Sequence, residues 1–156
     1  MLGPLVNPAF PKHQLTGVFN LELARLYGYL FQKTDQQFTI LYALDGYDEI
    51  SLTGPAKAIR NQGETLISPQ DFGIAELTAD QIIGGDNIPS SAAIFSAVLE
   101  GKGTEAQQNV VCANAAMAIA TATDCSPQVG YEKAKESLLS GRANQAFKTL
   151  QKLSAV

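Results

Sequence analysis

The chain has 156 residues, of which 46% are hydrophobic, and this is typical of one globular domain with a sizeable core. Its net charge of −4 and its scattered basic residues disfavour a nucleic-acid surface. No run reaches the roughly 18 apolar residues of a membrane span, and the N-terminus lacks a signal-peptide pattern. We therefore expect a cytoplasmic protein without a membrane partner, with Cys112 and Cys125 both reduced.

The first half of the chain combines strand patterns with one helix pattern. A strand-like stretch that begins at His13 leads into apolar residues at helical spacing, with Asn20 available as an N-cap. Runs of β-branched and aromatic residues, or strict alternation of apolar and polar residues, predict strands further on. The expected elements are a helix near residues 21–31, a buried strand over 37–44, a second strand over 49–54, and a hairpin over 56–68 around Asn61-Gln62-Gly63.

After residue 76 every segment follows a helical pattern. Residues 109–120 are apolar almost all round, which predicts a central helix packed on several sides. Asn114 within it needs a hydrogen-bond partner if it is buried, so we expect a structural role for it. The last two helices are amphipathic and more exposed. Helices are expected over 78–85, 89–103, 104–123, 126–141 and 142–156, and the mixture of elements places the chain in the α/β or α+β class.

A pair of adjacent carboxylates, Asp48 and Glu49, is the main candidate site. Neighbouring side chains on a strand point to opposite faces, so the two can reach one ligand only if the backbone turns, as Gly46 allows. Mg²⁺ is usually held by one or two protein carboxylates, with water and phosphate oxygens completing the coordination. From these residues alone a solvated acidic turn is the commoner alternative. Asp45 could join the cluster or cap the turn.

Three other features have both a functional and a structural interpretation. The run Gly84-Gly85-Asp86-Asn87 could bind an anion, but a glycine pair before a helix is more often a turn with a cap. His13 is the only histidine, and no triad pattern accompanies it, which favours a surface imidazole. The loop "GPLVNP" could line a pocket for a flat ligand or a contact between loops.

Short motifs follow one another along the chain: "LGPLVNPA" at 2–9, "GYDEIS" at 46–51, "SPQDFG" at 68–73, "GGDN" at 84–87, "AVLEGKG" at 97–103 and "NAA" at 114–116. Taken together, these motifs resemble the anthranilate phosphoribosyltransferase family, which joins anthranilate to phosphoribosyl pyrophosphate (PRPP). The resemblance implies an α/β catalytic domain of the nucleoside phosphorylase and phosphoribosyltransferase type, in which a mixed sheet precedes a helical section. A related pyrimidine nucleoside phosphorylase is disfavoured by "GPLVNPA" and "GYDEIS".

The resemblance also implies roles for individual residues. Asp48 and Glu49 match the family's Mg²⁺-binding acidic pair, and Gly3 and Pro4 match a loop that lies against anthranilate. Several family elements lie upstream of "LGPL" and have no counterpart: the N-terminal helical region, the Gly-Thr-Gly-Gly-Asp phosphate loop, the Lys-His-Gly-Asn segment and the arginine that faces the anthranilate carboxylate.

We therefore expect residues 1–156 to form a single α/β domain that is the C-terminal half of the enzyme. Such a piece should be inactive alone and should self-associate through exposed apolar surface. The alternative is a non-catalytic binding or scaffolding domain with the same fold. The sequence upstream of Met1 would separate the two, because only the enzyme needs the glycine-rich phosphate loop.

Overall fold

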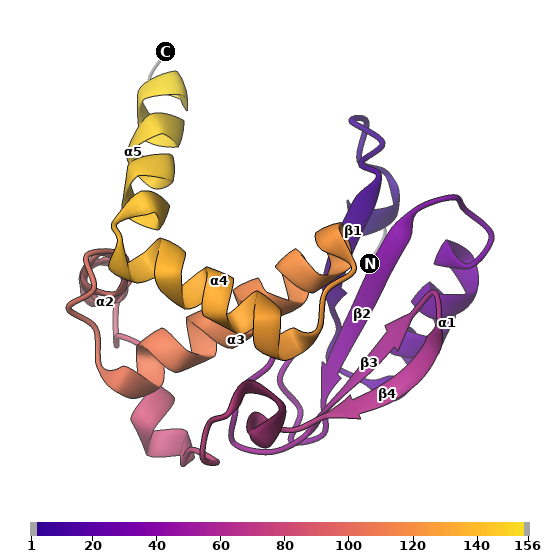
Figure 1. Cartoon of the computed structure of the whole chain (residues 1–156), viewed down its shortest axis with the longest axis horizontal. Coiled ribbons are helices and arrows are strands. Elements are labelled where there is room, and N and C mark those ends of the chain that lie inside the picture. The colour runs from indigo at the N-terminus through magenta and orange to yellow at the C-terminus, as the bar shows by residue number, and fades with distance from the viewer. Residues whose placement is uncertain (1–2, 155–156) are drawn as a thin grey trace.

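The structure is a computed structural model that describes residues 3–154, apart from the side chain of Pro4. A four-stranded sheet in the order β1-β2-β3-β4 lies at one end, and a group of helices extends from it (Figure 1). The first two strands are parallel, whereas the others pair antiparallel. The strands are β1 (His13–Gly17), β2 (Gln37–Ala43), β3 (Ala56–Arg60) and β4 (Gly63–Ile67), and the last two form the predicted hairpin.

Helix α1 (Leu21–Phe31) joins the two parallel strands, as predicted, and packs on one face of the sheet. It begins at Asn20, whose Oδ1 accepts a hydrogen bond from the Leu23 N–H at 2.8 Å. Its buried side contributes Phe31, which stacks on Phe38 of β2 with ring centroids 5.5 Å apart. The β1-α1-β2 unit therefore has its own small core, separate from the larger one under the other helices.

The predicted strand over residues 49–54 is wrong. Ile50 and Leu52 are both buried, which produces the alternating pattern, but Ser51 between them is buried as well. Leu52 has a left-handed backbone with φ of 62°, and both backbone groups of Ile50 bond to a side chain instead of a strand. The segment is an irregular loop that is buried from two sides.

The helical half follows the prediction with one correction. Residues 78–85 form only a short 3₁₀ turn, η3 (Ala79–Ile82), which a capping box at Thr78 starts and two glycines follow. The motif "SPQDFG" forms another such turn, η2 (Pro69–Phe72). The four longer helices have the predicted order. They are α2 (Ile88–Leu99), α3 (Glu105–Thr123), α4 (Pro127–Leu139) and α5 (Arg142–Ser154).

Helix α3 is the central helix, as predicted, and it contacts α4, β1 and β2. A Cβ atom on Gly130 of α4 would lie 2.5 Å from the Ala116 carbonyl oxygen, so the two helices pack with their backbones in close approach. The hydroxyl groups of Thr39 and Thr121 hydrogen-bond at 2.6 Å and connect the helix to β2. Because α3 touches both parallel strands, it is a fixed support for loops at the edge of the sheet.

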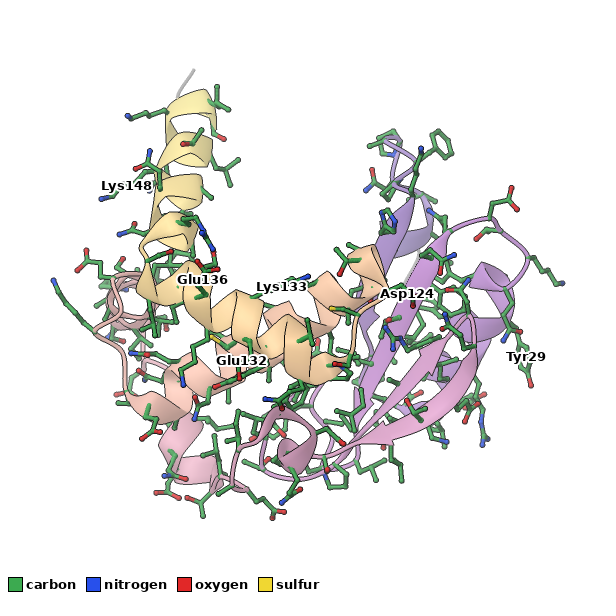
Figure 2. All side chains as sticks on the ribbon, in the orientation of Figure 1. Tyr29, Asp124, Glu132, Lys133, Glu136 and Lys148 are labelled. Carbon is green, nitrogen blue, oxygen red and sulfur yellow. The ribbon has the colours of Figure 1, made fainter. Side chains whose placement is uncertain are left out.

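The two C-terminal helices differ in how much they bury. Helix α4 buries Tyr131, where burial raises the pKa of the phenol to about 12 and the hydroxyl donates to Asn109 Oδ1 of α3 at 2.7 Å. Helix α5 buries no residue and projects away from α3 and α4 (Figure 1). Figure 2 shows Lys148 on α5 and Tyr29 on α1 at opposite ends of the molecule. Over residues 3–154, none of the helices has the length and apolar character needed to cross a membrane.

Candidate metal and substrate site

The candidate metal pair lies in the acidic loop, residues 44–55, between β2 and β3. This loop follows the carboxyl end of β2, and the parallel pairing brings the carboxyl end of β1 to the same edge of the sheet. The two segments touch at Gly17, where a Cβ atom would lie 1.5 Å from the Asp48 carbonyl oxygen. No side chain fits at position 17 without displacing Asp48. Loops at the carboxyl ends of strands are the usual place for ligands in α/β sheets.

The acidic loop turns at Gly46, as the sequence predicts. Gly46 has a φ of 99°, which favours glycine, and its N–H donates to the Ala43 carbonyl at 3.0 Å. The N–H of Ala43 donates in return to the Tyr47 carbonyl at 3.1 Å. A further bond from the Leu44 N–H to the Pro55 carbonyl at 3.0 Å closes the base of the loop. The loop is therefore a closed structure with a sharp turn directly before the two carboxylates.

Asp45 braces the loop from inside instead of joining the carboxylate pair. Its Oδ2 accepts hydrogen bonds from the Ser51 hydroxyl at 3.2 Å and from the Thr53 hydroxyl. The Thr53 and Ser51 hydroxyl oxygens lie 2.8 Å apart, so both hydroxyl groups gather around the same carboxylate oxygen. The sequence left open whether Asp45 joins the carboxylate pair or caps the turn. In the structure its carboxylate instead connects the first part of the acidic loop to Ser51 and Thr53 in the last part.

Asn114 of α3 holds the far limb of the acidic loop. Its amide bonds both the N–H and the carbonyl oxygen of Ile50, at 2.9 Å and 2.7 Å. Further along the same limb, the Leu77 N–H donates to the Leu52 carbonyl at 2.9 Å. The expectation that Asn114 has a structural partner is confirmed, and its partner is the backbone next to Glu49.

The side chains of Asp48 and Glu49 are themselves exposed, and neither takes part in the ion pairs found among residues 3–154. In this described range, no group of three or more His, Cys, Asp or Glu side chains is placed to hold a metal ion. Two exposed carboxylates on a fixed backbone do fit a hard cation whose other ligands are water and phosphate oxygens. They do not fit a cation held by protein groups alone.

The candidate substrate residues lie in the N-terminal loop, residues 3–12, ahead of β1. Gly3 begins a 3₁₀ turn, η1 (Gly3–Leu5), and a Cβ atom there would meet nothing within 4 Å. The Pro4 side chain and Leu2 lie outside the described residues. The N-terminal loop does border a cavity of about 330 Å³, although neither Gly3 nor the acidic pair lines it. The lining residues are Leu5, Asn7, Phe10, Pro11, Gln14, Leu30, Phe31, Thr34 and Gln36.

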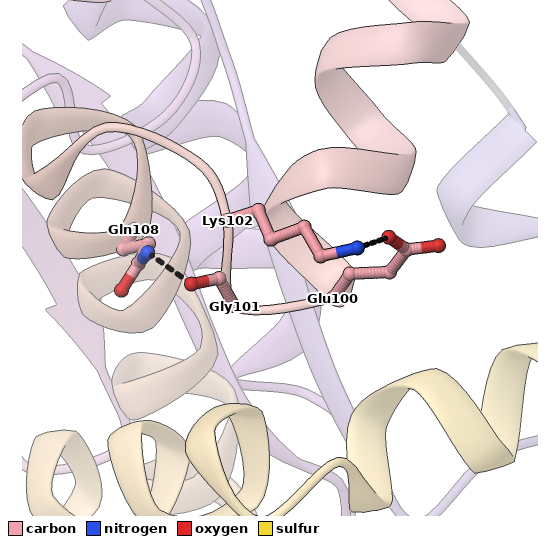
Figure 3. A network of polar contacts seen from close by, with 4 residues as sticks. All are labelled: Glu100, Gly101, Lys102 and Gln108. Carbon is pink, nitrogen blue, oxygen red and sulfur yellow. Dashed lines mark hydrogen bonds and ion pairs between the residues drawn. The ribbon is translucent and has the colours of Figure 1, made fainter.

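The remaining motifs have structural roles. Asn87 caps α2, accepting from the Ser90 N–H at 2.9 Å, and Gly85 packs so close that a Cβ atom would lie 2.4 Å from the Ser91 nitrogen. The motif "AVLEGKG" is the turn from α2 to α3, where Lys102 Nζ pairs with Glu100 at 2.8 Å and Gln108 donates to the Gly101 carbonyl at 3.2 Å (Figure 3). His13 is exposed, as expected.

Gly17 is the residue of this site that the sequence alone does not reveal, because a glycine at the end of a strand is common and its partner is 31 positions away in the chain.

A β-α-β unit with a braced acidic loop at its carboxyl edge, backed by a central helix, defines an α/β domain with a candidate cation site. The sequence profile of the glycosyl transferase family, a/b domain, matches residues 1–144. The chain belongs to this family.

Its relatives include anthranilate phosphoribosyltransferases, which confirms the resemblance. The enzyme of Flavobacterium johnsoniae is 63% identical over 154 residues, which are 99% of this chain and 47% of the relative. The enzyme of Christiangramia forsetii is 60% identical over 154 residues, which are 99% of this chain and 46% of the relative. The chain therefore spans just under half the length of these two relatives.

Solved structures confirm the expected fold class. The anthranilate phosphoribosyltransferase of Thermus thermophilus superposes with a TM-score of 0.86 at 24% identity, over 95% of this chain and 45% of that one. The enzyme of Saccharomyces cerevisiae in complex with PRPP and Mg superposes with a TM-score of 0.84 at 22% identity, over 94% of this chain and 43% of that one. At these identities the likeness concerns the α/β fold.

Proposed function

We propose that this chain supplies the C-terminal half of an anthranilate phosphoribosyltransferase, which transfers phosphoribosyl from PRPP to anthranilate and releases pyrophosphate in tryptophan biosynthesis. The observation that carries the proposal is the 63% identity with the Flavobacterium johnsoniae enzyme over 99% of the chain. The cytoplasmic location and the small-molecule partners expected from the sequence belong to the same proposal. The groups that hold the PRPP phosphates would come from the other half.

Asp48 and Glu49 are the proposed Mg²⁺ ligands. Their exposure leaves room for a phosphorylated substrate, and the braced loop keeps their backbone in place while the side chains turn towards the cation. When bound, Mg²⁺ would neutralise the charge of the pyrophosphate leaving group. The structure of the Saccharomyces cerevisiae enzyme in complex with PRPP and Mg supports the use of Mg²⁺ in the proposed reaction.

Gly3 and Pro4 are the proposed contacts for anthranilate. The open space around the position of a Gly3 Cβ atom means that packing within the described residues does not require glycine there. A flat aromatic ligand that lies against the backbone would give a reason for glycine at this position. The weakly nucleophilic amine of anthranilate needs orientation more than a base, so these residues would act by placing the ring.

The isolated chain should have no phosphoribosyl transfer activity, because the groups that hold the PRPP phosphates and the anthranilate carboxylate are proposed to lie elsewhere. Its Mg²⁺ affinity should be weak, in the millimolar range, since two carboxylates leave most of the coordination to water. Micromolar Mg²⁺ affinity without PRPP, or turnover by the purified 156-residue chain, would contradict this part of the proposal.

A chimeric enzyme tests the proposed function. In it, the 156 residues replace the matching 154-residue region of the Flavobacterium johnsoniae enzyme, and the loss of anthranilate fluorescence in the presence of PRPP and Mg²⁺ reports turnover. We expect turnover within about tenfold of the parent, which corresponds to a change of no more than about 1.4 kcal/mol in the activation barrier. A folded chimera without activity would indicate a non-catalytic binding or scaffolding domain instead.

A further inference from the structure

The amide of Asn114 makes contacts with the acidic loop that the metal proposal alone leaves unexplained. Nδ2 donates to the Ile50 carbonyl oxygen at 2.7 Å, and Oδ1 accepts from the Ile50 N–H at 2.9 Å. One side chain thus makes both hydrogen bonds that a neighbouring strand would make with this residue. Because Ile50 directly follows Glu49, the backbone that carries the acidic pair is attached to α3 at this point.

A third hydrogen bond fixes the orientation of this amide. Nδ2 also donates to the Val110 carbonyl oxygen, one turn earlier in α3, at 3.0 Å. Both amide hydrogens are therefore used, and a reversed amide would point Oδ1 at two carbonyl oxygens. Only a side chain with the size and the donors of asparagine satisfies Ile50 and Val110 together.

The backbone of the acidic pair is held at two residues, Asp48 and Ile50, which flank Glu49. On one side the Asp48 carbonyl lies against Gly17 of β1, where there is no room for a Cβ atom. On the other side Ile50 is held by Asn114. Glu49 lies between these two supports. A backbone fixed at both neighbours limits where the two carboxylates can reach.

We infer that Asn114 is a positioning residue for the acidic pair, fixing the backbone at Glu49 and Ile50 so that both carboxylates can reach one cation. The inference rests on the proposed Mg²⁺ role of Asp48 and Glu49. Groups that orient metal ligands through hydrogen bonds typically contribute about 10- to 100-fold in metal affinity. Asn114 acts through the backbone, so its effect lies at the lower end of this range.

The test uses the isolated 156-residue chain with Asn114→Asp, which keeps the size of the side chain but removes both donors. Asn114→Ala is the second variant, because it adds no charge and removes the acceptor as well. Asn109→Ala is the matched control, since Asn109 is on the same helix but bonds Tyr131 of α4. Two quantities are measured by NMR: the hydrogen exchange rate of the Ile50 amide, and the line broadening of amides 46–51 during a Mn²⁺ titration.

Both Asn114 variants should exchange the Ile50 amide at least about tenfold faster than the unsubstituted chain. Asn114→Ala removes the acceptor of that amide, and in Asn114→Asp a carboxylate oxygen would face the Ile50 and Val110 carbonyls without a donor between them. Their Mn²⁺ affinity at residues 46–51 should fall by about tenfold, whereas Asn109→Ala should change neither quantity. Unchanged exchange in both variants would overturn the inference. So would faster exchange with unchanged Mn²⁺ affinity.

The same Mn²⁺ titration distinguishes failure of the proposed metal role from failure of the positioning inference. If the unsubstituted chain shows no Mn²⁺ broadening at residues 46–51 up to tens of millimolar metal, the metal role of Asp48 and Glu49 is overturned, and the positioning role for a cation falls with it. If the unsubstituted chain binds Mn²⁺ there and the Asn114 variants bind it equally well, only the positioning inference is overturned.

Discussion

The two loops that carry the candidate site are supported in very different ways. The acidic loop is closed at its base, braced internally by Asp45, held by Asn114 and packed on Gly17. The N-terminal loop has Val6 and Phe10 largely exposed, 65% and 84%, and Phe10 has a positive φ of 44°. Within residues 3–154 the first loop has its supports, whereas much of the second faces outward.

This difference between the two loops indicates how the proposed metal-binding and anthranilate-binding roles differ in the support that they need. The proposed metal ligands, Asp48 and Glu49, need fixed positions, and this chain supplies contacts that fix the backbone beside them. A substrate loop needs an opposing surface, and Gly3 has open space where such a surface would lie. If the proposed function is correct, the metal half of the site is prepared within this chain and the anthranilate half depends on contacts from the other half.

Removing the charge of the acidic pair is expected to have the largest effect. In the chimeric enzyme, Asp48→Asn with Glu49→Gln keeps the shape of both side chains but removes two negative charges. Turnover should fall by roughly 10²-fold or more, because several kcal/mol of leaving-group stabilisation would be lost. Thermal unfolding should change little, since exposed carboxylates contribute little to stability. A double variant with near-normal turnover would show that the pair is only a solvated turn.

Gly17→Ala should damage the support of the acidic loop. Its Cβ atom would lie 1.5 Å from the Asp48 carbonyl oxygen, so β1 or the loop must shift. We expect a loss of about 1–3 kcal/mol in the free energy of unfolding, measured with urea. Gly54→Ala is the control in the same loop, because its nearest neighbour would be 3.9 Å away. Equal stability of the two variants would contradict the close contact.

Exposed apolar side chains on the helices should cause self-association of the isolated chain. Ile88 of α2 is 85% exposed and Leu153 of α5 is 77% exposed, and large apolar patches on a domain usually mark contact sites. Sedimentation velocity should show association that increases with concentration and weakens in Ile88→Ser with Leu153→Gln. Tyr29→Ser, at the opposite end of the molecule, is the control (Figure 2). A monomer at every concentration would refute this expectation.

The N-terminal loop should tolerate substitution with the smallest effect on stability. Gly3→Ala places a methyl group in open space, and Phe10→Ser removes a ring that is almost fully exposed. Each should change the free energy of unfolding of the isolated chain by no more than about 0.5 kcal/mol. In the chimeric enzyme Gly3→Ala should raise the KM for anthranilate. A large loss of stability in the isolated chain would show that the loop is better supported than its exposure indicates.

Local patterns predicted the elements whose signals are local. Asn20 and the apolar spacing after it were sufficient for α1, and the all-round apolar character of 109–120 was sufficient for the central place of α3. The segment 49–54 misled because apolar Ile50 and Leu52 alternate with polar Ser51 and Thr53 as in a half-buried strand, although Ser51 is buried too. Its left-handed Leu52 has no signature in the sequence.

The candidate carboxylates could be singled out from the sequence, whereas the contacts that support their loop could not. The acidic pair follows from motif resemblance, and Asn114 could be singled out as a polar residue in an apolar helix. Its partner Ile50 is 64 positions away, and the contact between Gly17 and Asp48 also joins distant segments. Contacts of this kind depend on the packing of α3 and β1 around the loop, which no local pattern encodes.

The Mg²⁺ dependence of the chimeric enzyme tests whether the acidic pair, Asp48 and Glu49, binds the catalytic metal. The measured quantity is the Mg²⁺ concentration that gives half-maximal turnover at saturating anthranilate and fixed PRPP, compared between the unsubstituted chimera and Glu49→Gln. The midpoint should rise by about tenfold in Glu49→Gln and excess Mg²⁺ should restore part of the turnover, because one of the two proposed ligand charges is lost. An unchanged midpoint would show that the acidic loop does not bind the catalytic metal.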